Sequence, residues 1–528
     1  MMYRILITGA LDEVALQIFG AEKDVQTDYR PDLPYQEILG IVGDYHAIVS
    51  RSETTITREL IDRGRKLKVI ARAAVGIANI DVDYATEKGI LVFNTPGKNT
   101  NSAAELTMGL LLAAVRKIIP AHRKLQAQGW DRHSFRGSEL LGKTIGIIGL
   151  GNVGHRVAQY ARAFEMEVLA YDPYIADDVF ESYQAHKVSL EELIARADVI
   201  TIHTPKTAET VNMLDAAAIA RMKPGVVLIN AARGSLINEQ ALLEGLKSGH
   251  VAAAGIDTWV QEPPKDNPFK DLPQVVMTPH IGASTLEAQR RIAATVAEQT
   301  LRALRDEVVD YPVNMPRFKV LVSPRVKSYI VLAEKLGSFA MQSLDFNPRH
   351  IQVMYRGELT SEEGAMIRRA FLKGFLKNTA EELVTFVNAE QKAGERGISI
   401  EDIDDPGFRD YASAVKFIVS DHDQTFTIGG VVLGENNYRL SLVNSFTFEV
   451  IPDGFMLYII NNDRPGVIGA IGTLLGENRV NISQFELSRN MPGGQAMSII
   501  RVDTRIEKDL LDKLNAVPNI VAVRSIQI

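Results

Sequence analysis

Three polar residues stand in apolar surroundings, each shortly after a run of residues typical of a buried strand. Arg233 lies in INAARGSLINE, Glu262 in GIDTWVQEPP and His280 in VVMTPHIGAST. The carboxyl ends of parallel strands form the ligand crevice of an α/β sheet, so we expect these side chains to meet there. A histidine oriented by a carboxylate can act as a general base, and an arginine can grip a carboxylate. The combination predicts hydride removal from a 2-hydroxy acid.

Taken singly, each of these residues has a structural explanation. A lone histidine is more often a satisfied structural residue than a catalyst, and a lone arginine more often forms an ion pair at the surface. Spacing alone leaves the catalytic and structural interpretations of Arg233, Glu262 and His280 evenly balanced.

A glycine fingerprint, GLGNVG, lies between an apolar run and a helical pattern. Gly149 permits a tight turn, Gly151 lets the backbone approach a pyrophosphate, and Gly154 permits close helix–strand packing. Asp172 follows where the next strand should end, and a carboxylate there can accept hydrogen bonds from a ribose. No arginine stands beside it to bind a 2′-phosphate, so the sequence predicts NAD rather than NADP.

Short apolar runs alternate with helical patterns up to about residue 314, which indicates doubly wound parallel sheets. The expected helices include 102–119 and 286–306. There are too many strands for one small sheet, so we predict two α/β units, the second inserted into the first. The expected strands are YRILIT, AIVS, LKVIARA, ILVFNT, TIGIIGL, EVLAYD, DVITIHT, GVVLINA, VAAAGID and QVVMTPH.

The remaining third of the chain has a different organisation. A proline-containing linker near residues 311–318 leads into an α+β segment, in which a helix is expected over 379–397. From Phe455 the order of predicted elements is βαββαβ, as in the ferredoxin-like unit. We therefore predict a discontinuous substrate domain (1–99 plus 287–316), a nucleotide-binding domain (100–286), an intervening domain (317–452) and a C-terminal domain (453–528).

Composition narrows the class of protein. The net charge of −7 and the absence of long Lys/Arg runs argue against a nucleic-acid surface. No cysteine is present, which excludes disulfides, thiolate metal sites and thiol catalysis, and we expect no metal. No apolar stretch is long enough to span a membrane and no leader-like start is seen, so we expect a cytoplasmic protein.

The segments GLGNVG, NAARGSLINEQAL, AAGIDTWVQEPP and TPHIGAST, in this order and spacing, resemble the D-isomer-specific 2-hydroxyacid dehydrogenases. The resemblance implies that Arg233, Glu262 and His280 are catalytic and that NAD is the cofactor. The residues it assigns to NAD binding are Gly149, Gly151, Asn152, Val153, Gly154, Asp172, Thr204, Ala231, Ala232, Asp257, His280, Gly282 and Ala283.

Two further resemblances concern the C-terminal third. NNDRPGVIGAIGTLLGENRVNI is similar to an ACT domain, a sensor that commonly binds amino acids between paired copies. NTAEELVTFVNAEQKAGERGI is similar to the intervening domain of long-form D-3-phosphoglycerate dehydrogenases. Together they imply oxidation of 3-phosphoglycerate with NAD, the first step of serine synthesis, in a homo-oligomer for which a tetramer is plausible.

The same resemblance implies binding residues for an anionic substrate and an effector. Arg51 and Arg72, with the backbone N–H groups of Val75 and Gly76, would bind the substrate; a surface ion pair is the alternative for each arginine. Serine would be bound by three residues of the ACT domain, although helix capping is an alternative for the aspartate. These three are Asn461, Asp463 and Asn481.

Two other functions remain open at this point. A glyoxylate or hydroxypyruvate reductase would have the same catalytic residues but would not need phosphate-binding arginines or a sensor domain. A non-enzymatic NAD-sensing interaction protein could be built on the same fold, because fold alone does not determine function.

Overall fold

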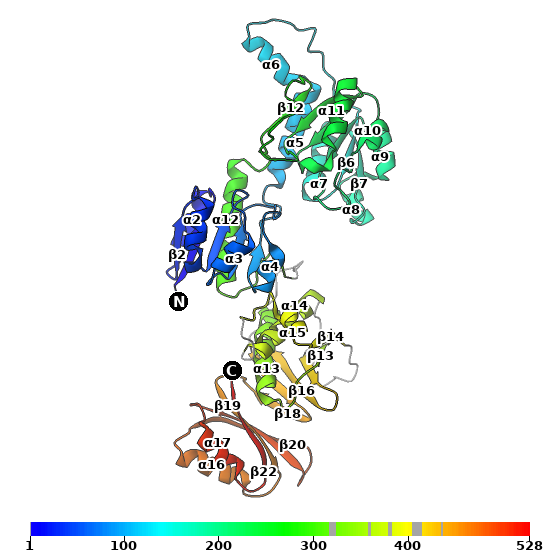
Figure 1. The fold of residues 1–528 in the computed structure, drawn as a ribbon. Coiled ribbons are helices and arrows are strands. Elements are labelled where there is room, and N and C mark those ends of the chain that lie inside the picture. Colours follow the sequence, from blue (N-terminus) through cyan, green and yellow to red (C-terminus); the bar gives the residue numbers. More distant parts are fainter. Residues whose placement is uncertain (1, 316–323, 357–360, 378–382, 404–413, 435–436) are drawn as a thin grey trace. The chain divides into compact units, whose positions relative to one another are not determined.

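The structure is a computed structural model that describes residues 2–528, except 316–323, 357–360, 378–382, 404–413 and 435–436. The chain divides into two compact units (Figure 1). One consists of Met1–Ala10, Phe19–Asn94 and Val296–Ile528, and the other of Leu11–Ile18 and Thr95–Thr295.

The N-terminal sheet has the strand order β2-β1-β3-β4-β5, and every pair of neighbours is parallel. Strands β3 and β4 are buried along their whole length because helices cover both faces of a parallel sheet. The strands are β1 Tyr3–Ile7, β2 Val25–Tyr29, β3 Ala47–Ser50, β4 Val69–Arg72 and β5 Leu91–Phe93, and the helices in this region are α1 Glu13–Gly20, α2 Tyr35–Ile41, α3 Arg58–Arg63 and α4 Val82–Glu87.

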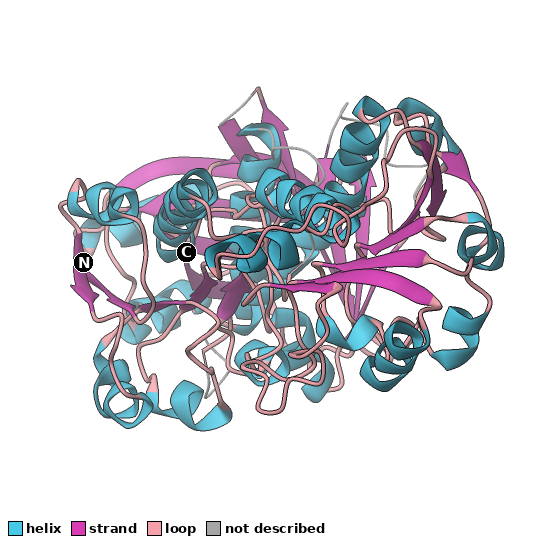
Figure 2. Cartoon of the chain, turned by 90° about the horizontal axis from the view of Figure 1, so that it is seen from above, coloured by secondary structure: helices cyan, strands magenta, loops and turns pink. Residues whose placement is uncertain are grey.

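The second unit contains a seven-stranded parallel sheet of order β12-β11-β10-β9-β6-β7-β8. Strands and helices alternate along the chain, and helices flank the strands in Figure 2. The strands are β6 Thr144–Ile148, β7 Glu167–Tyr171, β8 His186–Lys187, β9 Val199–Ile202, β10 Val226–Asn230, β11 Val251–Ile256 and β12 Val275–Met277. The helices are α5 Thr100–Val115, α6 Ile118–Gln126, α7 Asn152–Ala163, α8 Asp177–Ser182, α9 Leu190–Arg196, α10 Ala216–Ala220 and α11 Glu239–Ser248; α12 Leu286–Leu304 follows the last strand.

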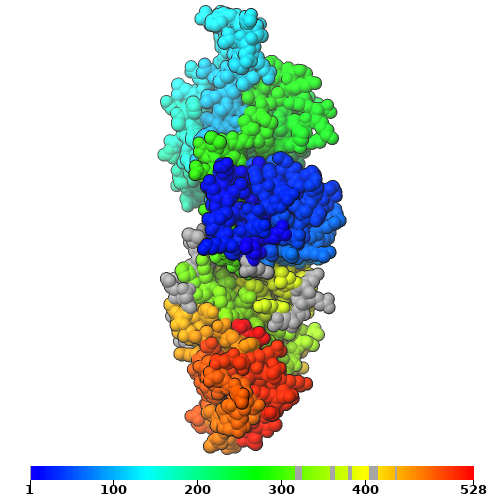
Figure 3. Space-filling model, turned by 90° about the vertical axis from the view of Figure 1, so that its left-hand side faces the viewer, coloured from blue at the N-terminus to red at the C-terminus, as the bar shows by residue number. Residues whose placement is uncertain are grey.

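Helix α6 differs from the other helices of its unit because none of its residues is buried. Its segment, cyan in Figure 3, stands clear of the body of that unit. Trp130, which follows the helix, is 79% exposed.

Residues after 323 form two further sheets. The first has the order β14-β13-β15-β16-β17-β18; β13 and β14 are parallel and the other neighbours are antiparallel. Its strands are β13 His350–Arg356, β14 Ser399–Asp402, β15 Ala414–Ser420, β16 Thr425–Leu433, β17 Asn437–Val443 and β18 Phe446–Val450, and its helices are α13 Pro324–Ser343, α14 Ser361–Leu376 and α15 Ala389–Glu395.

The C-terminal sheet has the order β20-β21-β19-β22 and is antiparallel throughout, as a ferredoxin-like βαββαβ unit requires. Alternate residues of β19 pack on opposite sides: Leu457 and Ile459 join the core beneath the two helices of this unit, whereas Met456 and Tyr458 join the core that includes α13. The elements are β19 Phe455–Asn462, α16 Val467–Glu477, β20 Ile482–Arg489, β21 Gln495–Val502, α17 Lys508–Asn515 and β22 Ile520–Gln527.

All ten predicted strands are present, and the predicted fold class is confirmed. Within the first 314 residues, two strands were missed. Strand β2 is a partly exposed edge strand of mixed polarity, VQTDY, and β8 has two exposed residues, so neither carries an apolar run. The helix expected over 379–397 was too long: α15 begins at Ala389, and residues 379–382 of that expectation lie outside the described residues.

Among the described residues, no helix combines the length and the apolar character that crossing a membrane would need.

A histidine joins β1 to the segment that enters β3. The N–H of Arg4 donates to Nδ1 of His46 (3.0 Å), and the N–H of His46 donates to the carbonyl of Arg4 (2.8 Å). Burial, aided by nearby positive charges, lowers the pKa of His46, and protonation would remove the acceptor that Arg4 uses.

Lowering the pH should therefore destabilise this sheet. The unfolded histidine takes up a proton near pH ~6.5, before the folded one does, so this contribution to stability is lost as pH falls below that value. His46→Asn keeps an acceptor for Arg4 without the titration. We expect its melting temperature to fall less than that of the wild type between about pH 7.5 and pH 5. Circular dichroism melts measure this, and parallel pH profiles of the two chains would contradict it.

Candidate active site

The three candidate catalytic residues follow three neighbouring parallel strands. Arg233 comes after β10, Glu262 after β11 and His280 after β12, and these strands are adjacent in the sheet. Parallel strands bring their carboxyl ends to one edge, so all three residues arise from the same edge of the second unit.

His280 and Glu262 form a direct pair. Nδ1 of His280 lies 2.7 Å from Oε2 of Glu262, and since a carboxylate only accepts, Nδ1 carries the shared proton. The other carboxylate oxygen accepts from the N–H of Trp259 at 3.1 Å, which fixes its direction. Both side chains keep roughly half of their surface in contact with solvent, 46% for His280 and 40% for Glu262. The arrangement leaves Nε2 of His280 to exchange a proton with a bound molecule.

A buried aspartate shapes the loop that carries His280. Asp257 has no exposed surface; its carboxylate accepts from Thr278 Oγ1 (2.6 Å) and from the N–H groups of Ile281 (2.8 Å) and Gly282 (2.9 Å). The N–H of His280 also donates to the Asp257 carbonyl, and His280 adopts a left-handed conformation with φ of 55°. Such a conformation is uncommon outside glycine and persists where surrounding bonds impose it.

The sequence suggested Asp257 only as an NAD contact. In the structure it is the anchor of the histidine loop, and its contact with NAD stays a prediction. The signal available from the sequence was that Asp257 is the first residue after a buried strand.

Arg233 belongs to a loop that packs closely on the segment bearing Glu262. A Cβ at Gly234 would lie 2.0 Å from the carbonyl carbon of Trp259, so only glycine allows the two backbones to approach. The carbonyl of Arg233 accepts from Asn230 Nδ2 at 2.8 Å, and its guanidinium donates to the carbonyl of Ala232 at 2.6 Å. The loop is thus tied both to β10 and to the neighbouring Trp259 segment.

The glycine fingerprint has the geometry that a dinucleotide needs. Gly149 has φ of 91°, and a Cβ at Gly154 would lie 2.0 Å from its carbonyl oxygen. A Cβ at Gly151 would meet no atom within 4 Å, so the turn is open on the side from which a pyrophosphate would approach. Gly151 also caps α7 without any side-chain bond, which leaves the helix N-terminus available to phosphate oxygens.

Asp172 and Thr204 flank this turn. Asp172 accepts from the N–H groups of Leu150 (2.9 Å) and Tyr174 (3.0 Å), so the carboxylate is held beside the glycine turn. Thr204 Oγ1 is buried without a hydrogen-bond partner, and a bound ligand would supply one. The remaining residues assigned to NAD follow strands or open helices at the same edge; they are Asn152, Val153, Ala231, Ala232, Gly282 and Ala283.

Four residues of the first unit were assigned to the substrate. Arg51 follows β3, lies against Gly9 and donates to the carbonyl of Ala10 at 2.8 Å. Val75 and Gly76 lie in the loop after β4, and no described residue accepts from their N–H groups. These groups are therefore available to an anion, whereas Arg72 has no exposed surface.

Sequence reasoning missed Asn94. Its Nδ2 donates to the carbonyl of Val75 at 2.7 Å, and its buried Oδ1 has no partner. Asn94 follows β5, the strand next to β4, so the position after a buried strand was the only signal for it.

The three candidate effector residues do not lie together within one ACT unit. Asn461 pairs with Ala496 at one end of β19, whereas Asn481 lies beside Asp503 at the opposite end, where Phe455 pairs with Val502. Six residue steps along β19, from Phe455 to Asn461, separate these ends by about 20 Å.

Asn461 and Asp463 share one end of this sheet. The Oδ1 of Asn461 is buried without a partner. Asp463 accepts from the N–H of Gly493 at 3.0 Å and from Arg489 at 3.3 Å, and these donors hold its pKa below the usual value. Any site that uses Asn481 together with the other two needs a second copy of the domain.

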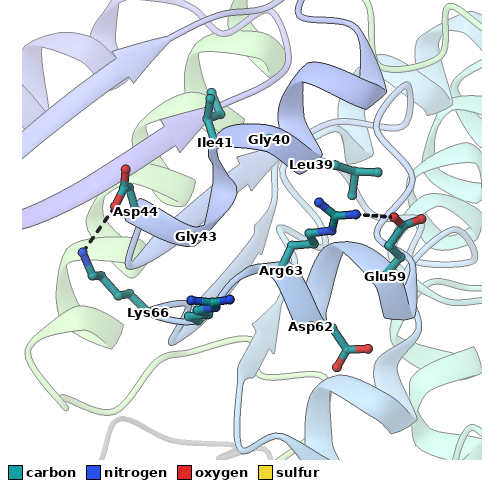
Figure 4. A pocket seen from close by; sticks show the side chains of 10 residues that line it. Leu39, Gly40, Ile41, Gly43, Asp44, Glu59, Asp62, Arg63 and Lys66 are labelled. Carbon is teal, nitrogen blue, oxygen red and sulfur yellow. Dashed lines mark hydrogen bonds and ion pairs between the residues drawn. The ribbon is translucent and has the colours of Figure 1, made fainter.

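A hollow on the N-terminal domain, drawn in Figure 4, is not a rival site. Four of the charged side chains drawn there pair with each other, Arg63 with Glu59 at 3.3 Å and Lys66 with Asp44 at 3.4 Å, and all four are exposed. Asp62 accepts instead from the hydroxyl of Tyr84 at 2.6 Å. Within the described residues, no group of three or more His, Asp or Glu side chains could hold a metal ion.

Known proteins match the chain along most of its length. Residues 108–282 match the family described as D-isomer specific 2-hydroxyacid dehydrogenase, NAD binding domain; residues 325–444 match the D-3-phosphoglycerate dehydrogenase intervening domain, and residues 455–519 the ACT domain. D-3-phosphoglycerate dehydrogenase of Methanocaldococcus jannaschii is 40% identical over 528 residues, and that of Bacillus subtilis 36% identical over 530; both alignments cover 100% of each chain.

Solved structures resemble a part of the chain. A D-lactate dehydrogenase from Aquifex aeolicus, complexed with NAD and lactic acid, aligns with a TM-score of 0.52 at 28% identity. The alignment covers 58% of this chain and 98% of that one.

The close approach of Gly154 to Gly149 generates a test. Gly154→Ala should weaken NADH binding about a hundredfold (~3 kcal/mol) or more, because its Cβ must displace the turn that faces the pyrophosphate. Titration of NADH fluorescence measures the Kd. Gly109→Ala in α5, where a Cβ meets no atom within 4 Å, is the matched control. Wild-type affinity in Gly154→Ala would show that the turn does not face the cofactor.

Proposed function

This chain belongs to the D-3-phosphoglycerate dehydrogenase family, and on that premise we propose that it oxidises 3-phosphoglycerate with NAD to 3-phosphohydroxypyruvate and NADH, the first step of serine synthesis. The observation that carries the proposal is the His280–Glu262 pair, 2.7 Å apart at the edge of the sheet that bears the dinucleotide fingerprint.

The chemistry follows from the protonation of this pair. His280 Nε2 accepts the hydroxyl proton of the substrate as the carbon–oxygen double bond forms. Glu262 accepts from Nδ1 and stabilises the imidazolium that results, because a carboxylate beside a cation is favourable. NAD, when bound, would supply the acceptor for the hydride that leaves the carbon. In the reverse direction the imidazolium returns the proton to the carbonyl oxygen.

Arg233 would bind the substrate carboxylate and polarise the carbonyl oxygen as it forms. Its backbone is tied to β10 by Asn230 and packs on the Trp259 segment, so the point from which the side chain extends is held in place. A bidentate guanidinium–carboxylate contact is geometrically specific, which suits discrimination for 2-hydroxy acids.

The N-terminal domain carries groups of its own that would suit an anion. Arg51 carries positive charge at the end of β3, and the N–H groups of Val75 and Gly76 point to no protein acceptor among the described residues. These features support a site for a substrate with two anionic groups, one for the guanidinium and one for the backbone donors.

Regulation by an amino acid is the finer part of the proposal. The buried, unpartnered Oδ1 of Asn461 and the carboxylate of Asp463 suit an ammonium group, and Asn481 of a second ACT unit would complete a serine site. Because the two ends of one unit are far apart, the effector would bind between copies. This supports a homo-oligomer, for which we propose a tetramer.

The substrate and the proton-transfer role are tested together. Production of NADH from 3-phosphoglycerate, followed by absorbance, should exceed that from glycerate or glycolate at equal concentration. His280→Ala should lower kcat at least about a hundredfold, the usual order for losing a proton-transfer group. The exposed His186→Ala, in the same unit, is the control. Preference for an unphosphorylated acid would favour the reductase alternative, and absence of turnover on every hydroxy acid would favour an NAD-sensing protein.

Effector binding is tested separately. Millimolar serine should raise the melting temperature of the wild-type chain and lower its activity, by linkage between binding and stability. Asn461→Ala should weaken serine binding about tenfold, the cost of losing one hydrogen bond to a charged ligand. Isothermal titration measures the affinity. Activity and melting temperature that do not respond to serine would remove the regulatory part and leave the catalytic part intact.

A further inference from the structure

Arg72, the last residue of β4, is a buried cation with unusual partners. It has no exposed surface, and its Nη2 donates to Asn79 Oδ1 (2.7 Å) and to the carbonyl of Thr54 (3.3 Å). Its hydrogen-bond partners among the described residues include no carboxylate, and its Nε and Nη1 have no hydrogen-bond partner. Burial lowers its pKa to about 10, so the guanidinium remains charged at neutral pH. A buried charge without a paired carboxylate is costly, and its retention calls for a role.

Asn79 connects Arg72 to the two loops that follow β3 and β4. Its Oδ1 accepts from Arg72, while its Nδ2 donates to the carbonyls of Ser52 (2.8 Å) and Thr54 (3.1 Å). Ser52 and Thr54 belong to the loop after β3 that begins with Arg51. Asn79 closes the loop after β4, which contains Val75 and Gly76. One amide therefore joins the two loops, and Arg72 holds that amide by its oxygen.

The loop after β4 is fixed at its other side by Asn94, which donates to the carbonyl of Val75. With Asn94 on one side and Asn79 on the other, the segment between them is held by polar bonds from buried or half-buried side chains. Its own N–H groups at Val75 and Gly76 remain directed to no described acceptor.

We propose that Arg72 is a positioning residue. It does not touch the substrate; through Asn79 it locks the loops after β3 and β4 so that Arg51 and the N–H groups of Val75 and Gly76 present one anion-binding surface. This inference rests on the proposed function of the N-terminal domain and assigns Arg72 a different part in it from direct substrate contact.

The chemistry of the two side chains explains why neither is readily replaced. An aspartate at position 79 could still accept from Arg72, but its oxygens would repel the carbonyls of Ser52 and Thr54. A lysine at position 72 keeps the charge, but its ammonium is more strongly hydrated and its flexible stem does not hold a donor in the fixed direction of Nη2, the one atom that donates to both Asn79 and Thr54. The buried cation also lies beneath an anion-binding loop, where its positive potential favours an anionic ligand.

The test compares Arg72→Lys, Asn79→Asp and the double variant in the full-length chain. Arg63→Gln, which removes an exposed ion pair in the same domain, is the control. We expect each single variant to raise the KM at least about tenfold for 3-phosphoglycerate and for an unphosphorylated 2-hydroxy acid alike, because both need the loop. The Kd of NADH, whose fingerprint lies in the other unit, should change less than about twofold. The KM of the double variant should be no higher than that of the single variant with the higher KM, since both substitutions break one network.

Several results would overturn the proposal. A KM effect limited to the phosphorylated acid would show that Arg72 contacts the phosphate directly. If the KM increase of the double variant equals the product of the two single increases, the two residues act independently. A KM within twofold of the wild type in both single variants would show that Arg72 does not position the loops. A merely structural role would lower the active fraction, and hence kcat, at unchanged KM.

Two further measurements allow the proposal to be tested if a variant does not fold or if another hydroxy acid is the substrate. If Arg72→Lys does not fold, as judged by circular dichroism, Asn79→Asp decides alone because it retains the buried cation. The wild-type rate on 3-phosphoglycerate reports on the proposed function itself; if another hydroxy acid is the substrate, its KM is compared among the same variants. Protection of the wild type and the variants against thermal unfolding by 3-phosphoglycerate measures binding without turnover.

Discussion

The parallel arrangement of the central sheet is the constraint on which the candidate active site depends. Arg233, Glu262 and His280 follow β10, β11 and β12, and Gly149, Asp172 and Thr204 follow β6, β7 and β9. Segments separated by more than a hundred residues reach one edge because each strand runs in the same direction. A single antiparallel strand would send its loop, and the residue it bears, to the opposite edge.

Strand direction brings the loops together, but buried polar groups decide their shape. Asp257 binds the backbone of Ile281 and Gly282 and so holds the loop of His280 in a left-handed conformation. In the N-terminal domain, the amide of Asn79 joins the loops after β3 and β4, and Arg72 donates to that amide. A buried polar group that loses its partner is costly, so each of these networks resists rearrangement of the loop above it. The side chains that hold these loops are therefore buried or half-buried, while the candidates for contact with a ligand, His280, Glu262 and Arg51, are exposed or half-buried.

The C-terminal sheet shows the same principle through packing. Its two central strands, β19 and β21, are buried on both faces, one face beneath α16 and α17 and the other in the core that contains α13. Effector binding at this sheet must therefore use its ends or edges. The register of β19 with β21 places Asn461 and Asn481 at opposite ends, which makes a shared site between copies the arrangement consistent with all three predicted residues.

The sequence by itself determined the class of fold, the fingerprint of the cofactor and the identity of the candidate catalytic residues. Alternation of apolar runs with helical patterns follows from burial on both faces of a parallel sheet, and it located ten strands; β2 and β8 escaped because edge strands are not buried in this way. Only the tertiary structure decided which of the candidate polar residues are accessible to a ligand and which are buried where they can only support a loop. Arg51 and Arg72 both end buried strands and look alike in sequence, yet one lies on a loop and the other has no exposed surface. Asn79 and Asn94 were not singled out, and Asp257 was assigned to NAD alone, because a hydrogen bond between segments distant in the chain depends on where the fold places its acceptor.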